Sequence, residues 1–477
     1  MLRKQSRRLR SRRRVRGHIE ELERRALMAA SFLNGVEWRS IDGTGNASTD
    51  PNNPAFRRGA AETQQIRFGY GTDFPDLFGD AIITDSSTPK SRENPRTISN
   101  VIHAQNGSVP DKRLLTDWVF QWGQFITHDV DLTRTGAQFN VLSDDVTVGD
   151  FRIKIEDPND PLYNVNNPYI PFNRSQFDPT TGDNTDVPAP FPPGSFKKNN
   201  REVINAITSY IDASMVYGSN DERADALRTF KNGKLLTTAG GKLPSFNTPG
   251  LENDNAIGLP ADKLFLAGDL RANEQVNLTA VHALFVREHN RLADLIKKNY
   301  KTMNDEEIYQ MARRIVGAEM QIITYEEYLP AVMGFDHAPD PDGGAYNPAT
   351  NASITNAFAH AFFRFGHSQI SDSTLLVNNA GKVVDNLTIA EAFFNPDFLK
   401  NNPGNVDLMM KDWRRRSGRR TTYSWSMGSA TRSSALLARA ASIWRRSTSI
   451  AAATTGYPTT TRCGSCMASR LERFCSR

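Results

Sequence analysis

LLTDWVFQWGQFITHDVDLT, Leu114–Thr133, is the stretch that decides the fold, because its apolar residues repeat at the spacing of an amphipathic helix. Gln124 and His128 lie four positions apart and therefore share a helix face, whereas Asp129 points away from that face. One buried helix can then contribute side chains to two sites. The apolar residues of its buried face are Leu115, Trp118, Val119, Trp122, Phe125 and Ile126.

Four further motifs follow this segment along the chain. A lone histidine at the end of an aromatic-rich helix is usually a structural residue, so the helix alone does not establish a site. The four motifs are TSYIDASMVYGS from Thr208, GDLRANE from Gly268, VREHNRLA from Val286 and AFFRFGHS from Ala361. Together with WGQFITHD, these motifs resemble the animal-type haem peroxidases of the peroxidase–cyclooxygenase superfamily, from about Arg113 to about Leu408.

The resemblance implies a mainly α fold, with one large haem-peroxidase domain, long irregular loops and little β structure. We expect this domain to span residues 31–410 and to be incomplete at its C-terminal end. Stretches rich in Asn, Asp, Gly and Pro, such as residues 156–200, fit loops that wall a cleft. Residues 1–30 are expected to be a basic leader and residues 411–477 an aberrant basic tail.

Composition is that of an ordinary globular protein, with 38% hydrophobic and 23% charged residues in 477. No run of about 18 apolar residues occurs, so we expect no membrane span. The net charge of +5 comes from the two ends, because residues 26–412 hold 34 basic and 49 acidic residues. An acidic body argues against a nucleic-acid partner.

The leader is too weakly apolar for a conventional signal peptide. Its segment HIEELERRALMAA, from His18, resembles leaders of exported proteins, so we expect a secreted or cell-envelope location. All three cysteines, Cys463, Cys466 and Cys475, lie in the basic tail. A body without cysteine excludes a disulfide scaffold and presents no thiol to peroxide.

The Thr208–Ser214 loop supplies hydroxyl, carbonyl and carboxylate oxygens at alternate positions, which suits Ca²⁺. The resemblance implies that this loop and the aspartate after His128 enclose a calcium ion. Calcium would then tie the loop to the helix end that carries His128. The matching ligands are Asp129, Thr208, Tyr210 through its backbone carbonyl, Asp212 and Ser214.

The remaining site residues are also implied by the resemblance. His128 matches the distal base that takes a proton from hydrogen peroxide, Arg271 the arginine beside it and Gln124 a residue that orients water or halide. His367 matches the proximal ligand of a haem b iron. Glu274 matches a carboxylate that can form an ester with a haem methyl.

Two positions depart from the family pattern for covalent haem attachment. Thr127 stands where the other ester-forming residue is an aspartate, and Gln275 stands where myeloperoxidase-like members have a methionine bonded to haem. At most one covalent link, through Glu274, is therefore expected.

Two long helices are expected next to these motifs. One carries apolar positions from Val281 to Ile296, with Arg287, Glu288 and His289 as packing and ion-pair residues. The second runs from about Asp305 to Tyr328. Asn304 and Glu307 indicate a capping box at its start, and Pro330 is expected to stop it.

The preferred interpretation is a haem peroxidase that uses hydrogen peroxide and small electron donors such as halide, thiocyanate or phenols. One alternative is a fatty-acid dioxygenase of the same superfamily, which needs a tyrosine three residues before the proximal histidine; here that residue is Arg364. The other is an extracellular calcium-binding or adhesive protein that keeps the fold without catalysis. The oligomeric state is left open.

The tail generates a first testable prediction, that the chain after about Lys411 is a frameshifted reading of its gene. Composition changes there to Arg, Ser, Thr and Ala, and Glu472 is the only acidic residue from Trp413 onward. Such a segment lacks the apolar period of a closing helical layer. Codons that encode residues 443–461 permit, from the third base, LAALNI, two variable residues and GRDHGLPDYN.

The shifted reading resembles the LNIQRGRDHG motif of the family, whose asparagine hydrogen-bonds the proximal histidine. Residues 423–434 permit LVVDGVRNSLF in the same shifted frame. Without that partner of His367, we expect poor haem retention and low activity from the chain as written. Resequencing of the gene tests this, and a read that keeps the present frame to the end contradicts it.

Overall fold

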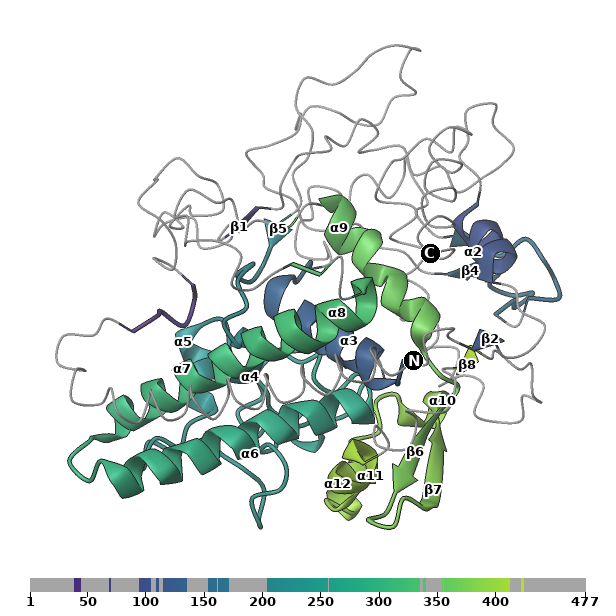
Figure 1. Cartoon of the computed structure of the whole chain (residues 1–477). Coiled ribbons are helices and arrows are strands. Elements are labelled where there is room, and N and C mark those ends of the chain that lie inside the picture. The colour runs from purple at the N-terminus through teal and green to yellow at the C-terminus, as the bar shows by residue number, and fades with distance from the viewer. Residues whose placement is uncertain are drawn as a thin grey trace, which may run out of the picture.

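The computed structural model describes a helical body with small strand pairs at its edges (Figure 1). The expectation of a mainly α fold with little β structure is confirmed. The leader expected at residues 1–30 lies outside the described residues, as does the tail apart from its two residues in a strand. The structure describes residues 38–43, 68–69, 94–103, 109–110, 115–134, 153–160, 162–170, 204–255, 257–334, 338–339, 354, 356–411 and 422–423.

Three helices form the centre of the body: α3 (Trp118–Val130), α6 (Val276–Asn299) and α7 (Asp305–Ile323). A short connection joins α6 to α7, so the two pack side by side as an antiparallel pair (Figure 1). α3 packs on α6 and buries Phe125 completely, against Phe285 at 5.3 Å between ring centroids. The helix predicted in the first motif is therefore confirmed. Of its predicted buried face, Phe125 and Ile126 are buried, and Trp118, Val119 and Trp122 are half-buried against the core. Leu115 precedes the helix.

Local sequence signals explain where α6 and α7 begin. Asn304 accepts a hydrogen bond from the backbone N–H of Glu307, and the Glu307 side chain accepts one from the backbone N–H of Asn304. This is the predicted capping box. At the start of α6, the Gln275 side chain accepts a hydrogen bond from the backbone N–H of Asn277.

The expectation that Pro330 stops the second helix is wrong. α7 ends at Ile323, a π-helical turn η6 (Thr324–Tyr328) follows, and α8 (Leu329–Met333) continues the helical path with Pro330 in its first turn. Proline is tolerated there because its missing N–H would not find a partner in a first turn anyway. The wide turn before it restarts the hydrogen-bond pattern, with the N–H of Leu329 donating to the carbonyl of Thr324.

The packing roles predicted for the VREHNRLA motif are confirmed. Arg287 pairs with Asp407 at 2.7 Å, and Glu288 pairs with Arg291 at 2.6 Å. His289 is fully buried between the Tyr217 hydroxyl and the carbonyl of Gly233, at 2.8 and 2.7 Å.

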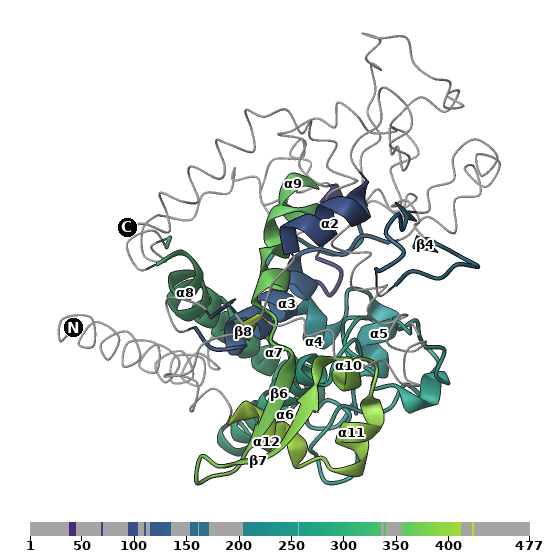
Figure 2. The ribbon, with the colours of Figure 1, turned by 90° about the vertical axis from the view of Figure 1, so that its right-hand side faces the viewer.

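A hairpin and short helices cover the other side of α6 (Figure 2). The hairpin pairs β6 (Ser373–Val377) with β7 (Val383–Thr388), antiparallel. Apolar residues of β6, α11 and α12 form a second core cluster with Val276, Ala280 and Ala283 of α6. α6 is therefore the wall shared by the two main cores. The short helices here are α10 (Ile389–Ala392), α11 (Pro396–Asn401) and α12 (Asn405–Met410).

The remaining described elements are short. The helical ones are α2 (Pro95–His103), α4 (Ser214–Tyr217), α5 (Asp221–Ala226), η5 (Ala261–Lys263), α9 (Asn356–His360) and η7 (Phe362–Gln369). The two-residue strands pair antiparallel as β1 (Phe68–Gly69) with β5 (Ile204–Asn205), β2 (Val109–Pro110) with β8 (Thr422–Tyr423), and β3 (Ile153–Lys154) with β4 (Tyr169–Ile170).

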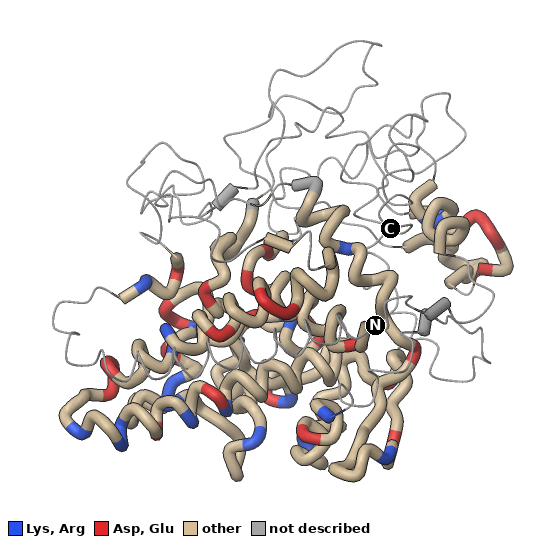
Figure 3. The backbone as a smooth tube through the Cα atoms, viewed as in Figure 1, with Lys and Arg blue, Asp and Glu red and all other residues tan. Residues whose placement is uncertain are grey.

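Charges of both signs are spread over α6 and α7 (Figure 3). Among the described residues, no helix is both long enough and apolar enough to cross a membrane.

Candidate active site

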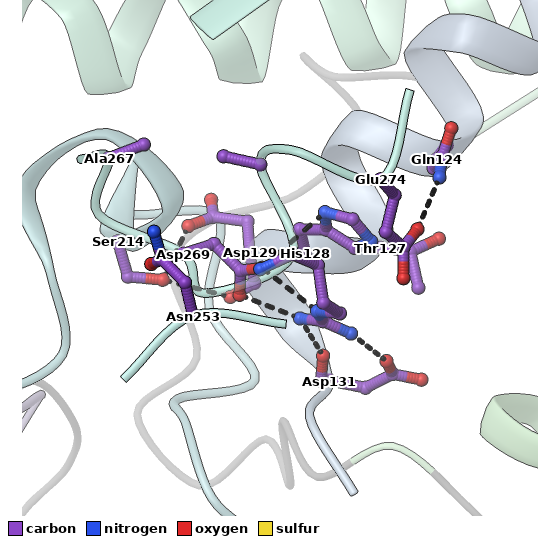
Figure 4. Close-up of polar contacts among 12 residues, drawn as sticks. Gln124, Thr127, His128, Asp129, Asp131, Ser214, Asn253, Ala267, Asp269 and Glu274 are labelled. Carbon is purple, nitrogen blue, oxygen red and sulfur yellow. Dashed lines mark hydrogen bonds and ion pairs between the residues drawn. The ribbon is translucent and has the colours of Figure 1, made fainter. Parts of the chain in front are cut away.

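The C-terminal half of α3 and the loop Gly268–Glu274 come together as one buried site (Figure 4). Gly268 makes this approach possible, because a Cβ there would lie 2.4 Å from the carbonyl oxygen of Ser214 and 2.5 Å from the backbone nitrogen of Gly218. Only a residue without a side chain fits at that position. The close packing brings Asp269 and Arg271 against the end of α3.

His128 lies in this site with only 4% of its surface exposed. Its Nδ1 lies 3.5 Å from Oδ1 of Asp269 and has no hydrogen-bond partner within the described residues. Burial, followed by the positive charge of Arg271, lowers the pKa of His128 well below its usual value. The imidazole is therefore neutral near pH 7 and has a lone pair with which to accept a proton.

Arg271 is held by the Asp269 carboxylate and by the backbone carbonyl of Asp131. Its Nε donates to Asp269 Oδ1 at 2.9 Å and its Nη2 to Asp269 Oδ2 at 2.8 Å, while Nη2 also donates to the backbone carbonyl of Asp131. Burial opposes ionisation of Asp269, but the charge of Arg271 and the hydrogen bonds from it lower its pKa overall. Asp269 also raises the pKa of Arg271 against the effect of burial, so this pair stays ionised.

Glu274 and Gln124 belong to a chain of buried hydrogen bonds. Gln124 Nε2 donates to Glu274 Oε2 at 2.8 Å. Gln275 Nε2 donates to Oε1 of Gln124 at 3.0 Å and to Oε1 of Gln121 at 2.6 Å. Burial and, next, the charge of Asp254 raise the pKa of Glu274 to about 8. Gln124 thus has both ends of its amide engaged, and its role toward water or halide stays a prediction.

The oxygens expected to hold calcium converge on the other face of the α3 end. Asp129 Oδ2 accepts from the backbone N–H groups of Asp212 and Ala213, both at 3.0 Å, and Oδ1 accepts from the Ser214 hydroxyl at 2.8 Å. The Thr208 hydroxyl donates to Asp212 Oδ2 at 2.9 Å and lies 3.4 Å from the carbonyl of Tyr210. Two carboxylates, two hydroxyls and one carbonyl therefore share one buried place.

The electrostatics of this oxygen cluster favour a cation. Burial, and then the charge of Asp212, raise the pKa of Asp129 to about 8. Burial also raises the pKa of Asp212, although the charges of Arg39 and Arg313 oppose this shift. Two buried carboxylates in one cluster repel each other unless a positive charge lies with them. Hard oxygen donors match Ca²⁺. In the described part of the chain no group of three or more His, Cys, Asp or Glu side chains forms a metal cluster, so a site here depends on hydroxyl and carbonyl oxygens.

His367 lies on η7, which packs against α3. Burial, followed by the charge of Arg364, lowers the pKa of His367 to about 3. A neutral imidazole is the form that binds iron. The aromatic side chains next to His367 in the chain are only partly turned inward, because Phe362 and Phe365 are 40% and 38% exposed within the described residues. The charge of Arg364 acts on both His128 and His367, which places η7 near both.

Sequence reasoning missed Asp269, Asp131 and Asp254. Asp269 stands two residues before Arg271 in the GDLR motif, and that spacing was the available signal. Its contact with His128, however, depends on residues that are far apart in the sequence. The backbone carbonyl of Asp131 accepts a hydrogen bond from Arg271. A backbone contact of this kind cannot be predicted from a pattern of residue types.

Comparison with known proteins gives a consistent result. Residues 38–425 match the family model described as animal haem peroxidase. A peroxidasin homolog of Caenorhabditis briggsae is 36% identical over 349 residues, which are 67% of this chain and 26% of that protein. Peroxinectin A of Dictyostelium discoideum is 30% identical over 80% of this chain and 68% of its own length. The chain thus spans about a quarter of the peroxidasin relative it matches.

Solved structures give the same fold. Peroxidase A from Dictyostelium discoideum superposes with a TM-score of 0.63 and 26% identity, over 80% of this chain and 68% of that one. A fatty acid alpha-dioxygenase from Arabidopsis thaliana has a TM-score of 0.56 at 18% identity, over 79% of this chain and 55% of that one. At that identity the second likeness concerns the fold alone.

Proposed function

The chain belongs to the animal haem peroxidase family, and from this membership we propose that it is a haem peroxidase that reduces hydrogen peroxide and oxidises small donors. The observation that carries the proposal is a buried, neutral His128 beside the fixed, charged Arg271. A base and a cation at one dry place are what cleavage of a peroxide bond requires. Halide, thiocyanate and phenols are the donor classes we propose.

The residues fit haem b in chemical type. When bound, haem would supply the two electrons for peroxide reduction from its iron and its porphyrin together. His367, as a neutral imidazole, would hold this iron. His128 would take a proton from one peroxide oxygen and return it to the departing oxygen. Arg271 would stabilise the negative charge that develops on the departing oxygen, most strongly because the site excludes water.

We also propose Ca²⁺ at the oxygen cluster of Asp129, Thr208, Tyr210, Asp212 and Ser214. The cluster binds the end of α3 to the loop that precedes α4, and His128 is the residue before Asp129. Calcium would therefore hold the proton-accepting ring in place through the backbone of α3.

One ester link to haem, through Glu274, is proposed. The Glu274 carboxyl group accepts a hydrogen bond from Gln124. Because its pKa is raised to about 8, this group is protonated and uncharged in most copies of the protein at pH 7. The Thr127 hydroxyl instead donates to the backbone carbonyl of Gly123 at 2.7 Å. A secreted or cell-envelope location is proposed from the leader sequence alone.

The two alternative functions differ from a peroxidase in the residues and the cofactor that they need. A fatty-acid dioxygenase would need a tyrosine where this chain has Arg364. A calcium-binding or adhesive protein without catalysis would carry no haem. A Soret band at roughly 400–430 nm, expected of a histidine-ligated haem, separates the peroxidase from this second alternative.

His128→Ala should abolish peroxide turnover and leave haem bound. The ring accepts the peroxide proton but does not ligate iron, and loss of a general base costs about 10²-fold or more in rate. Guaiacol oxidation and the Soret absorbance measure the two effects. Lys298→Ala, at an exposed position near the end of α6, is the control and should keep wild-type rates. Wild-type guaiacol oxidation by His128→Ala would rule out the proposed base.

Calcium removal should destabilise the protein and lower its peroxide turnover. A ligand at about 100 times its Kd stabilises a fold by about 2.7 kcal/mol, and this stabilisation is lost with the ion. Thermal unfolding with chelator, and then with excess Ca²⁺, measures it. Asp212→Asn should lose the calcium dependence, whereas Asp160→Asn, a buried carboxylate outside the cluster, should keep it. Equal midpoints for wild type with and without Ca²⁺ would refute the calcium site.

Glu274→Gln should release all haem to acid–acetone. An amide cannot form the ester, and Thr127 offers no carboxyl in its place. Peroxide-treated wild type should retain haem on the protein after the same extraction. Complete extraction of haem from treated, active wild type would contradict the proposed link.

A further inference from the structure

Asp269 accepts several directed hydrogen bonds from Arg271 in addition to balancing its charge. Its Oδ1 accepts from both the backbone N–H and Nε of Arg271, at 2.8 and 2.9 Å, and its Oδ2 accepts from Nη2 at 2.8 Å. The side chain is 3% exposed. Both carboxylate oxygens are thus committed to one arginine in a bidentate geometry that fixes the plane of the guanidinium.

The backbone around Asp269 is itself fixed. Its N–H donates to the carbonyl of Met215 at 3.0 Å, within α4. Gly268, the preceding residue, lies in close backbone contact with Ser214 and Gly218. Asp269 is therefore anchored by the main chain, and Arg271 takes its position from Asp269.

The Nη1 end of the Arg271 guanidinium can donate to a further hydrogen-bond acceptor. The described hydrogen bonds of Arg271 use Nε and Nη2, while Nη1 approaches Asp131 Oδ1 only to 3.8 Å, beyond hydrogen-bond distance. Arg271 is also 12% exposed, more than Asp269. Within the described residues, the N–H groups on Nη1 thus make no hydrogen bond and can donate to a small oxygen-containing molecule in the site.

The same carboxylate faces the base. Asp269 Oδ1 is 3.5 Å from His128 Nδ1, which has no other partner in the described part of the site (Figure 4). An acceptor beside Nδ1 favours the tautomer that carries its proton there and leaves the lone pair on Nε2. Such contacts are often long without substrate and shorten in the reactive complex.

We infer that Asp269 is a positioning residue for the proposed peroxide reaction, which orients Arg271 with Nη1 toward the peroxide and holds His128 in the tautomer with its proton on Nδ1. One carboxylate then sets the direction of both the cation and the base. This inference rests on the proposed function for its consequence in catalysis, but the arrangement of side chains can be tested independently.

Asp160 offers a matched control. It is also buried and accepts a bidentate pair from Arg96, with Nε to Oδ2 at 2.6 Å and Nη2 to Oδ1 at 2.7 Å. Asp160→Asn and Asp269→Asn therefore remove the same charge from the same type of arginine pair. A general loss of stability affects both variants, whereas a positioning role affects only Asp269→Asn.

The experiment compares haem-loaded wild type, Asp160→Asn, Asp269→Asn and Asp269→Ala. Haem content and the thermal midpoint report folding, and stopped-flow absorbance gives the rate constant for peroxide. We expect Asp269→Asn to lose about 10-fold or more, and Asp269→Ala about 10²-fold, the range of general acid–base effects. The KM for the electron donor should stay unchanged.

A second measurement does not depend on turnover. NMR of ring-¹⁵N-labelled histidine, with His128→Ala to assign the signal, reports which nitrogen of His128 carries the proton. We expect Nδ1–H in wild type and in Asp160→Asn, and a mixture of tautomers in Asp269→Ala. If Asp269→Ala does not fold, Asp269→Asn is the substitute for the tautomer measurement. On an Arg271→Gln background, Asp269→Asn should cost less rate than on the wild-type background, because only its effect through His128 remains.

The outcomes separate the two proposals. Rates of both Asp269 variants within about twofold of Asp160→Asn, or an unchanged His128 tautomer in Asp269→Ala, overturn the positioning role. If wild type binds haem but does not react with peroxide, the proposed function fails. The tautomer measurement then still decides the role of Asp269.

Discussion

The site depends on the geometry of one helical turn, in which consecutive residues point in directions about 100° apart. Because of this, His128 and Asp129 cannot face the same place, and each reaches a different polar cluster at the end of α3. Asp129 binds the backbone of the loop before α4, and His128 faces the loop that carries Asp269 and Arg271. Any shift of the α3 end therefore moves both clusters together.

Burial makes the balance of charge the next constraint. A carboxylate without a cation beside it has a raised pKa in this interior, as Glu274 and Asp129 have, whereas the pKa of Asp269 beside Arg271 is lowered. Asp129 and Asp269 are both buried, so the difference between their pKa shifts comes from the partner and not from depth. Asp269, next to His128, is therefore ionised, whereas Glu274 and Asp129 need a proton or a nearby cation to be stable.

The sequence predicted those parts of the structure that depend on local chemistry. The apolar period of α3 and the capping box of α7 require only neighbours along the chain, and both are as expected. The path through Pro330 was not predictable from the rule that proline ends a helix, because a π-helical turn upstream absorbs the disruption. Asp269 was missed because its role depends on contact with His128, 141 positions earlier in the chain. That contact depends on close backbone packing that only a glycine at position 268 permits.

Gln275 shows how a departure from the family pattern becomes part of the local structure. Its side chain caps α6 by accepting from Asn277, and its amide nitrogen donates to both Gln121 and Gln124. Gln124 in turn donates to Glu274. A thioether could accept only weakly and could donate nothing, so methionine here would leave the buried amide oxygens of Gln121 and Gln124 without this donor. Gln275 therefore fixes, through two hydrogen bonds in series, the Glu274 carboxyl group for which the ester link to haem is proposed.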